Sequence, residues 1–140
     1  IIRVLVKGRF SENVFMNELN RWALLKHLEV PTFPNDFHFD LLLEDGTACR
    51  TWRLERILVL NAPEQRAIPL APHNLYWLET KGRLVAGGPG WAEPVQGGFF
   101  QGCLPIDLDE PLCIEIQSCD WEGLLKISQN VCQLSSQTEL

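Results

Sequence analysis

Hydrophobic and polar residues alternate between Phe37 and Glu44, in the segment FHFDLLLE, with Leu42 as the one apolar residue on the side of His38 and Asp40. Every second residue, starting at Phe39, is apolar, whereas His38 and Asp40 lie on the opposite side of the alternation. A period of two is typical of a β-strand with one face in a hydrophobic core. The second face of this strand is then either a solvated surface or a metal or phosphate site.

Similar short segments recur along the whole chain and are separated by Gly, Pro, Asn and Asp, as in β-sandwiches and β-barrels. The Asp45-Gly46 turn predicts a hairpin, because glycine tolerates a positive φ there. One short helix is predicted over Ser11–Asn20, with Ser11 as its N-cap. The predicted strands are Arg3–Lys7, Arg21–Lys26, Phe37–Glu44, Ala48–Glu55, Ile57–Leu60, Ala67–Leu70, Leu75–Thr80, Gly98–Pro105, Leu112–Gln117, Leu124–Ser128 and Val131–Leu134.

A chain of 140 residues is long enough for one domain with a sizeable core and short for two. We therefore expect an all-β protein, a single-domain β-barrel with one short helix near the N-terminus. Residues 1–20 would be an extension packed on the barrel or leading into it. Residues 21–128 would form the barrel, and residues 129–140 a polar C-terminal tail.

Composition restricts the partners of this domain. No apolar run approaches the length of a membrane span, so we expect no membrane association. The net charge of −6 argues against a protein that coats nucleic acid nonspecifically, although a local basic cluster could still hold one phosphate or one strand end. The five cysteines form no CxxC pair and are odd in number, which favours buried thiols in a reducing cytoplasm.

The chain has only three histidines, His27, His38 and His73, and each falls at the end of a predicted strand. A lone histidine at such a position is usually a surface residue. His38 and Asp40 make a stronger pair, because residues two apart on a strand project in the same direction and can reach one cation. The spacing by itself recurs often by chance.

These histidines carry a resemblance to a known family. HFDLLLEDG followed by RTWRL resembles the core motif of the 3′-phosphoesterase domain of bacterial DNA ligase D. RWALLKH resembles the preceding strand of that family, and PHNLYWLETKG its later histidine segment. GGPGWAEPVQGGFFQG is similar to its glycine-rich turn and the strand that follows. The resemblance covers roughly residues 21–128, and all three histidines fall on family positions.

The resemblance implies a site. His27, His38 and Asp40 would hold a divalent metal, most often manganese, with zinc or cobalt as alternatives. Mixed imidazole and carboxylate ligands suit such ions better than calcium. His73 would contact the phosphate and, with His38 and Asp40, form the catalytic group. The metal would polarise the phosphoryl group and orient the attacking water.

The chain departs from the family pattern at two positions. A family arginine that binds phosphate is replaced by Leu42, and a family tyrosine by Trp77. We expect Arg56, with Arg53 as the second choice, to supply the missing positive charge. The alternative is that both arginines are solvated surface charges. Glu44, on the strand of Asp40, and Trp77 would hold the metal ligands in position without binding the metal themselves.

The resemblance implies a metal-dependent 3′-phosphoesterase, a hydrolase for DNA end processing and repair, with the nucleic-acid 3′ end as partner. A separate ligase or polymerase would work beside it. One alternative is a weak or inactive relative that binds nucleic-acid ends or a protein partner. The other is an unrelated ligand-binding barrel in which the histidines are incidental.

Overall fold

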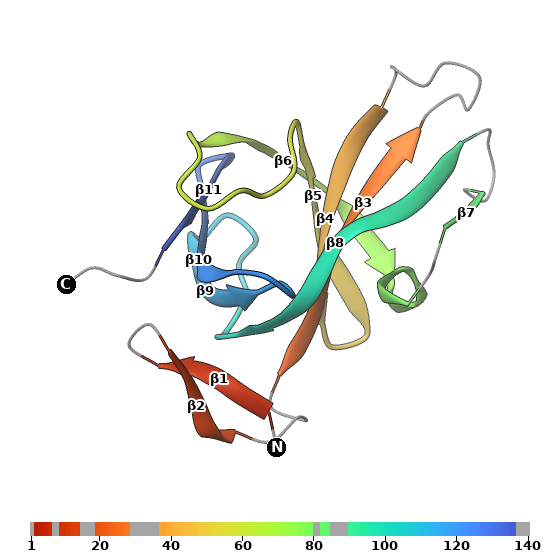
Figure 1. Cartoon of the computed structure of the whole chain (residues 1–140). Helices are drawn as coiled ribbons and strands as arrows, with labels where there is room; N and C mark the ends of the chain where they lie inside the picture. Colours follow the sequence, from red (N-terminus) through yellow and green to blue (C-terminus); the bar gives the residue numbers. More distant parts are fainter. Residues whose placement is uncertain are drawn as a thin grey trace.

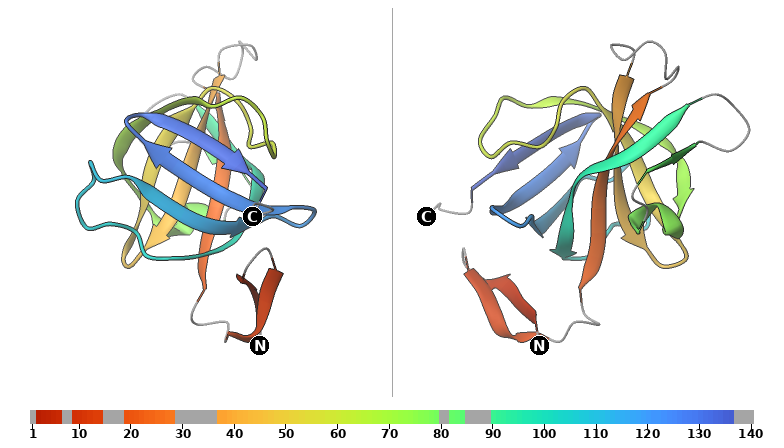
Figure 2. Two further views of the ribbon diagram at one scale, coloured as in Figure 1. Left: turned by 90° about the vertical axis from the view of Figure 1, so that its left-hand side faces the viewer. Right: turned by 45° about the vertical axis from the view of Figure 1, so that its right-hand side comes forward.

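The computed structural model of the protein describes residues 2–6, 9–14, 19–28, 37–79, 82–84 and 90–136. Eight antiparallel strands pair in a ring, which confirms the predicted all-β, barrel-like fold (Figures 1 and 2). In ring order the strands are β3 (Asn20–Leu28), β4 (Phe37–Asp45), β5 (Ala48–Leu54), β6 (Gln65–Asn74), β11 (Val131–Ser135), β10 (Glu122–Ser128), β9 (Leu112–Gln117) and β8 (Trp91–Gln101). Pairing between β8 and β3 closes the ring, and the short β7 (Arg83–Leu84) is added to β8.

The predicted helix over Ser11–Asn20 is wrong where the structure describes that segment. β2 (Arg9–Val14) is a strand that pairs antiparallel with β1 (Ile2–Val6) in a separate two-stranded sheet. Residues 15–18 lie outside the described part of the chain. A helix of ten residues is only marginally stable by itself. The pairing of β2 with β1, whose sequence is apolar, therefore prevails over the tendency of Ser11 to cap a helix.

Two predicted strands have other conformations. Leu75–Leu78, within the predicted strand Leu75–Thr80, forms the 3-10 helix η2, whose first turn is capped by the Asn74 side chain. The predicted strand Ile57–Leu60 is a loop in which Leu58 is buried. Both backbone groups of Leu58 bond to the side-chain amide of Gln96 at 2.8 Å, which replaces the pairing that a strand would have made.

The other predicted strands are present with shifted ends. The Asp45-Gly46 hairpin is confirmed, with φ of 68° at Gly46. β8 begins earlier than predicted, at Trp91. The barrel also extends beyond the predicted boundary at residue 128, because β11 pairs with both β10 and β6. Val131–Ser135, within the predicted tail, therefore belongs to the barrel.

The sheet has two apolar faces. All eight strands of the ring contribute to the large interior cluster, in which Phe39, Leu41 and Leu43 are buried as the alternation predicts. A smaller outer cluster lies on the opposite face of β3, β4, β5 and β8. Its members are Ala23, Leu25, Leu42, Cys49, Trp77 and Ala92. Figure 1 shows η2 beside β3 and β4, on the side away from β9 to β11, where it covers this cluster.

Within the described residues, no helix is long and apolar enough to cross a membrane.

Candidate metal centre

Two of the three histidines are direct neighbours across adjacent strands. His27 on β3 pairs with His38 on β4, so both side chains leave the sheet on the same face. His27 Nδ1 lies 3.0 Å from His38 Nε2, and the two rings meet edge to face. This face is the outer one, because Leu25 and Leu42 of the outer cluster follow the same alternation along the two strands.

Asp40 completes the group from the same strand as His38. Asp40 Oδ1 lies 3.4 Å from His38 Nε2, and Asp40 Oδ2 lies 3.9 Å from His27 Nδ1. One ligand atom from each residue can be chosen so that all three lie within 4.8 Å of one another. His27, His38 and Asp40 could therefore bind one metal ion, as the resemblance implies.

The spacing of these atoms fits a small divalent ion. Two ligand atoms at about 2.1 Å from an ion lie about 3.0 Å apart at right angles and about 3.4 Å apart in a tetrahedral arrangement. The observed distances of 3.0 and 3.4 Å are close to these values, whereas the 3.9 Å distance, which is to the other oxygen of Asp40, is longer. Two imidazoles and a carboxylate are also a donor set that manganese, zinc and cobalt accept.

The carboxylate of Asp40 can accept a further hydrogen bond or bind a cation. Its side chain is only 6% exposed, and Oδ1 has no hydrogen-bond partner among the described residues. Burial alone would raise the pKa of Asp40, but interactions with His38 and His73 outweigh it and hold that pKa well below its ordinary value. A buried, ionised oxygen without a donor is the kind of group that a cation satisfies.

His73 reaches the same carboxylate from β6, with Nε2 at 3.7 Å from Asp40 Oδ2. Between Leu70 and His73, β6 contains one residue more than β5 opposite it, which is a β-bulge. Without that extra residue Pro72 would pair with Cys49, and His73 would point to the interior side of the sheet. The bulge therefore turns the third histidine onto the face of the other two.

The backbone carbonyl of Ala71 sets the orientation of the His73 ring. It lies 3.1 Å from His73 Nδ1 and accepts that N–H, which leaves Nε2 directed at Asp40. The interaction with Asp40 raises the pKa of His73 above its ordinary value, against the opposing effect of burial. The sequence reasoning missed this carbonyl, although prolines inside a strand, here Pro69 and Pro72, are a signal for a bulge.

Arg53 is the arginine that the structure brings to the group. It pairs with Asp40 across β4 and β5, and its Nε lies 3.9 Å from Asp40 Oδ1. The side chain is 40% exposed, and the buried Nε has no hydrogen-bond acceptor among the described residues. A guanidinium in this position can receive an anion at the open side of the carboxylate.

Arg56 lies in the loop after β5, and its guanidinium donates to the carbonyls of Pro63 and Glu64 at 3.1 and 3.2 Å. Its backbone amide donates to the side chain of Gln65. The bonds that the structure gives Arg56 thus hold the β5–β6 loop, and its predicted phosphate contact remains a prediction. Of the two predicted arginines, the second choice, Arg53, lies beside Asp40.

The two residues predicted to support the ligands lie further along the outer face. Glu44 accepts hydrogen bonds from the backbone and side chain of Arg21, at 2.7 to 3.2 Å. Trp77 is buried over Leu42, which is itself completely buried in the outer cluster. Leu42 is therefore part of the apolar cluster beside the candidate metal centre. The family that the chain resembles has a phosphate-binding arginine at this position.

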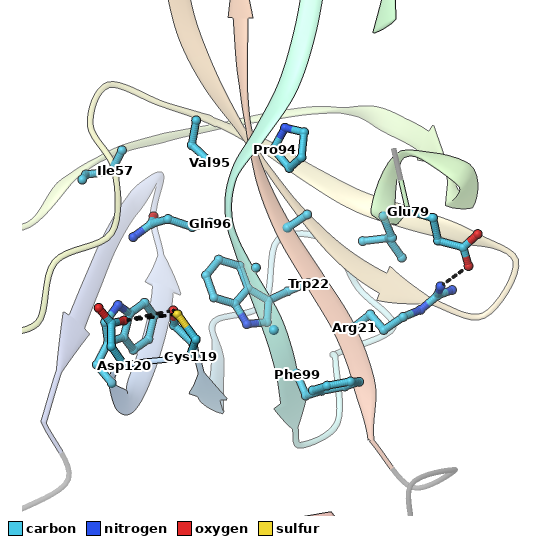
Figure 3. A pocket seen from close by; sticks show the side chains of 16 residues that line it. Arg21, Trp22, Ile57, Glu79, Pro94, Val95, Gln96, Phe99, Cys119 and Asp120 are labelled. Carbon is cyan, nitrogen blue, oxygen red and sulfur yellow. Dashed lines mark hydrogen bonds and ion pairs between the residues drawn. The ribbon is translucent and has the colours of Figure 1, made fainter. Parts of the chain in front are cut away.

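A groove of about 740 Å³ among the described residues is separate from the histidines. It crosses β8 and is lined by parts of β3, β8 and the turn between β9 and β10 (Figure 3). Trp22, Gly97 and Gly98 are among its lining residues, and the ion pair between Arg21 and Glu79 lies at one end. None of the predicted site residues lines this groove.

Comparison with known protein families finds no family that matches the chain, and comparison with curated proteins finds no matching relative.

Proposed function

We propose that the protein is a metal-dependent phosphoesterase that acts on the 3′ ends of nucleic acid. One observation carries the proposal. Three imidazoles that are remote in the sequence converge on one buried carboxylate, Asp40, on the outer face of the sheet. The donor set of this group suits a manganese ion, with zinc or cobalt as alternatives.

In this proposal His27, His38 and Asp40 hold the ion, which supplies Lewis-acid polarisation of the phosphoryl group when it is bound. The other residues act on the phosphate itself. Arg53 donates to a phosphate oxygen through its exposed guanidinium, which takes the place of the family arginine that Leu42 lacks. Asp40 favours the form of His73 that is protonated at both ring nitrogens, and in this form Nε2 would stabilise charge on the phosphate or donate a proton to the leaving group.

The contact with nucleic acid would be local. The net charge of −6 disfavours a broad phosphate-binding surface, whereas one terminal phosphate needs only the group around Asp40. The five cysteines are free, in keeping with a reducing cytoplasm as the proposed location. A separate ligase or polymerase would use the processed end.

The test is phosphate release from a 3′-phosphate primer-template in the presence of manganese. We expect release by the wild-type protein and a loss of at least about 100-fold in Asp40→Asn, because the ligand set is broken. Asp45→Asn is the matched control, since Asp45 is exposed at the end of the same strand. No release from the wild-type protein, or equal release from both variants, would contradict the proposed activity.

A second candidate function is binding without catalysis, to a nucleic-acid end or a protein partner. It is favoured by Leu42 and Trp77, which are buried in the outer cluster where the resembling family has an arginine and a tyrosine. Here the protein would bind a 3′-phosphate end in a manganese-dependent way without releasing phosphate. Measuring binding and release on the same primer-template separates the two functions.

A further inference from the structure

A second arginine on β5, Arg50, points to the opposite face from Arg53. It pairs with Leu43 of the interior cluster and is only 6% exposed. The two arginines are three positions apart on the strand, so their side chains leave the sheet on different sides. Arg50 thus belongs to the inside of the barrel, where a charged side chain needs a partner.

The partners that the structure describes are few. One terminal nitrogen of Arg50 donates to the backbone carbonyl of Pro105, and the guanidinium stands over the Trp52 ring at 5.6 Å. Its Nε is buried and has no acceptor, and no carboxylate among the described residues lies within ion-pair distance. A buried cation with one backbone acceptor and one ring is strongly destabilising unless an anion or water is also present.

A cavity adjoins this guanidinium. It has a volume of about 40 Å³ and lies between Arg50, Trp52, Pro69 and Leu108. This space accommodates about three water molecules, or the head of one carboxylate or phosphate group. A larger cavity of about 260 Å³ shares three of its lining residues and is bordered by Asp109 and Glu110. These two carboxylates would repel a polyanion, so a nucleic-acid strand does not fit there.

We propose that Arg50 is the receptor for a single oxyanion group, a carboxylate or a phosphate, of a small ligand whose remaining atoms lie in the larger cavity. The oxyanion would accept from the free Nε and a terminal nitrogen, in the paired geometry that guanidinium groups favour. This site is separate from the candidate metal centre and does not depend on the proposed function.

The test is a titration of the metal-free protein, kept in chelator, with sodium acetate and, separately, with inorganic phosphate. The observed signal is the Arg50 Nε–H resonance in NMR spectra at constant ionic strength, assigned by its loss in Arg50→Met. We expect a saturable shift with a Kd of about 1 mM or tighter for at least one anion. Acetate alone would identify a carboxylate site, and phosphate alone a phosphate site.

Sodium chloride is the control anion, and Arg66→Met, at an exposed position of β6, is the control variant that should keep the shift. If Arg50→Met does not fold, Arg50→Lys serves instead. Its anion affinity, followed by the indole N–H resonance of Trp52 at the same cavity, should be lower by at least about tenfold, because lysine lacks the paired donors. A linear drift that chloride reproduces, or saturation by chloride alone, would overturn the proposal.

Discussion

His73 Nε2 lies 3.7 Å from Asp40 Oδ2, although the two residues belong to strands that are not adjacent in the sheet. The contact bridges β5, which stands between β4 and β6 and contributes Arg53 to the same group. In the proposed site, His73 and Arg53 can both act on a phosphate without being among the three metal ligands.

Replacement of His73 should separate catalysis from metal binding. We expect His73→Gln to lower phosphate release by about 100-fold or more, because the proton at Nε2 is lost, and to leave the manganese affinity within a few-fold of wild type. Release is measured on the 3′-phosphate primer-template, and manganese affinity by titration calorimetry. A parallel loss of both would show that His73 is a metal ligand instead.

Removal of the bulge should have the same effect by another route. Deletion of Pro72 leaves one residue fewer between Leu70 and His73, so the histidine turns away from Asp40. We expect loss of phosphate release with the β-rich circular dichroism spectrum retained. Unchanged release would mean that the bulge does not position the ring.

Metal binding should stabilise the fold. An ion that binds only the folded protein raises the free energy of unfolding by about 2.7 kcal/mol when its free concentration is 100 times its Kd. We expect manganese to raise Tm in the wild-type protein and in Asp45→Asn, and chelator to reverse the shift. In Asp40→Asn the shift should be absent, and an undiminished shift there would place the ion elsewhere.

Leu42→Arg, which introduces the arginine of the family that the chain resembles, should destabilise the folded protein rather than improve phosphate binding. Leu42 is completely buried in the outer cluster, so Leu42→Arg would bury an unpaired charge. We expect a loss of about 3 kcal/mol or more in the free energy of unfolding, measured by denaturant titration. Leu42→Met, which keeps the volume, should cost less than about 1.5 kcal/mol. Equal stability of both variants would contradict the buried position.

Glu44 should contribute to stability at neutral pH. Burial alone would raise its pKa, but hydrogen bonds from Arg21 outweigh it and lower that pKa in the folded protein. A lowered folded pKa means that the contribution is present above the unfolded pKa and is lost as the pH falls through the folded value. The pair is partly exposed, so we expect less than about 1 kcal/mol.

The measurement is the difference in unfolding free energy between wild type and Glu44→Gln as a function of pH. It should be constant near neutral pH and shrink below about pH 4. Glu122→Gln, at an exposed position, should show no such dependence. A difference that grows on acidification would reverse the sign of the argument.

The strand pattern predicted half of the candidate site. Alternation along β4 placed His38 and Asp40 on one face, since the side-chain period of a strand is independent of the rest of the fold. The partnership of His27 with His38 depends on the register between two strands, and only the resemblance suggested it before the structure was known.

Other features depend on competition between nearby groups for hydrogen bonds and strand pairing, which the composition does not reveal. The choice between Arg53 and Arg56 remains a prediction, although the loop carbonyls of Pro63 and Glu64 engage Arg56, whereas Arg53 lies beside Asp40. The face of His73 depends on a single extra residue in β6, and the η2 helix on a cap from Asn74. In each case the alternatives differ little in energy, and the pairing of neighbouring segments determines which one forms.

The outward position of the histidines has a consequence for the size of what can reach them. The space beside Arg50 is small, about 40 Å³, and exposed residues such as Leu108 are part of its lining. The outer face of the sheet, which carries Asp40, is not enclosed by the ring of strands, so a long polymer could lie across it with one terminus near the carboxylate. In the two proposals, one sheet would contact a macromolecule on its outer face and bind a small molecule beside Arg50.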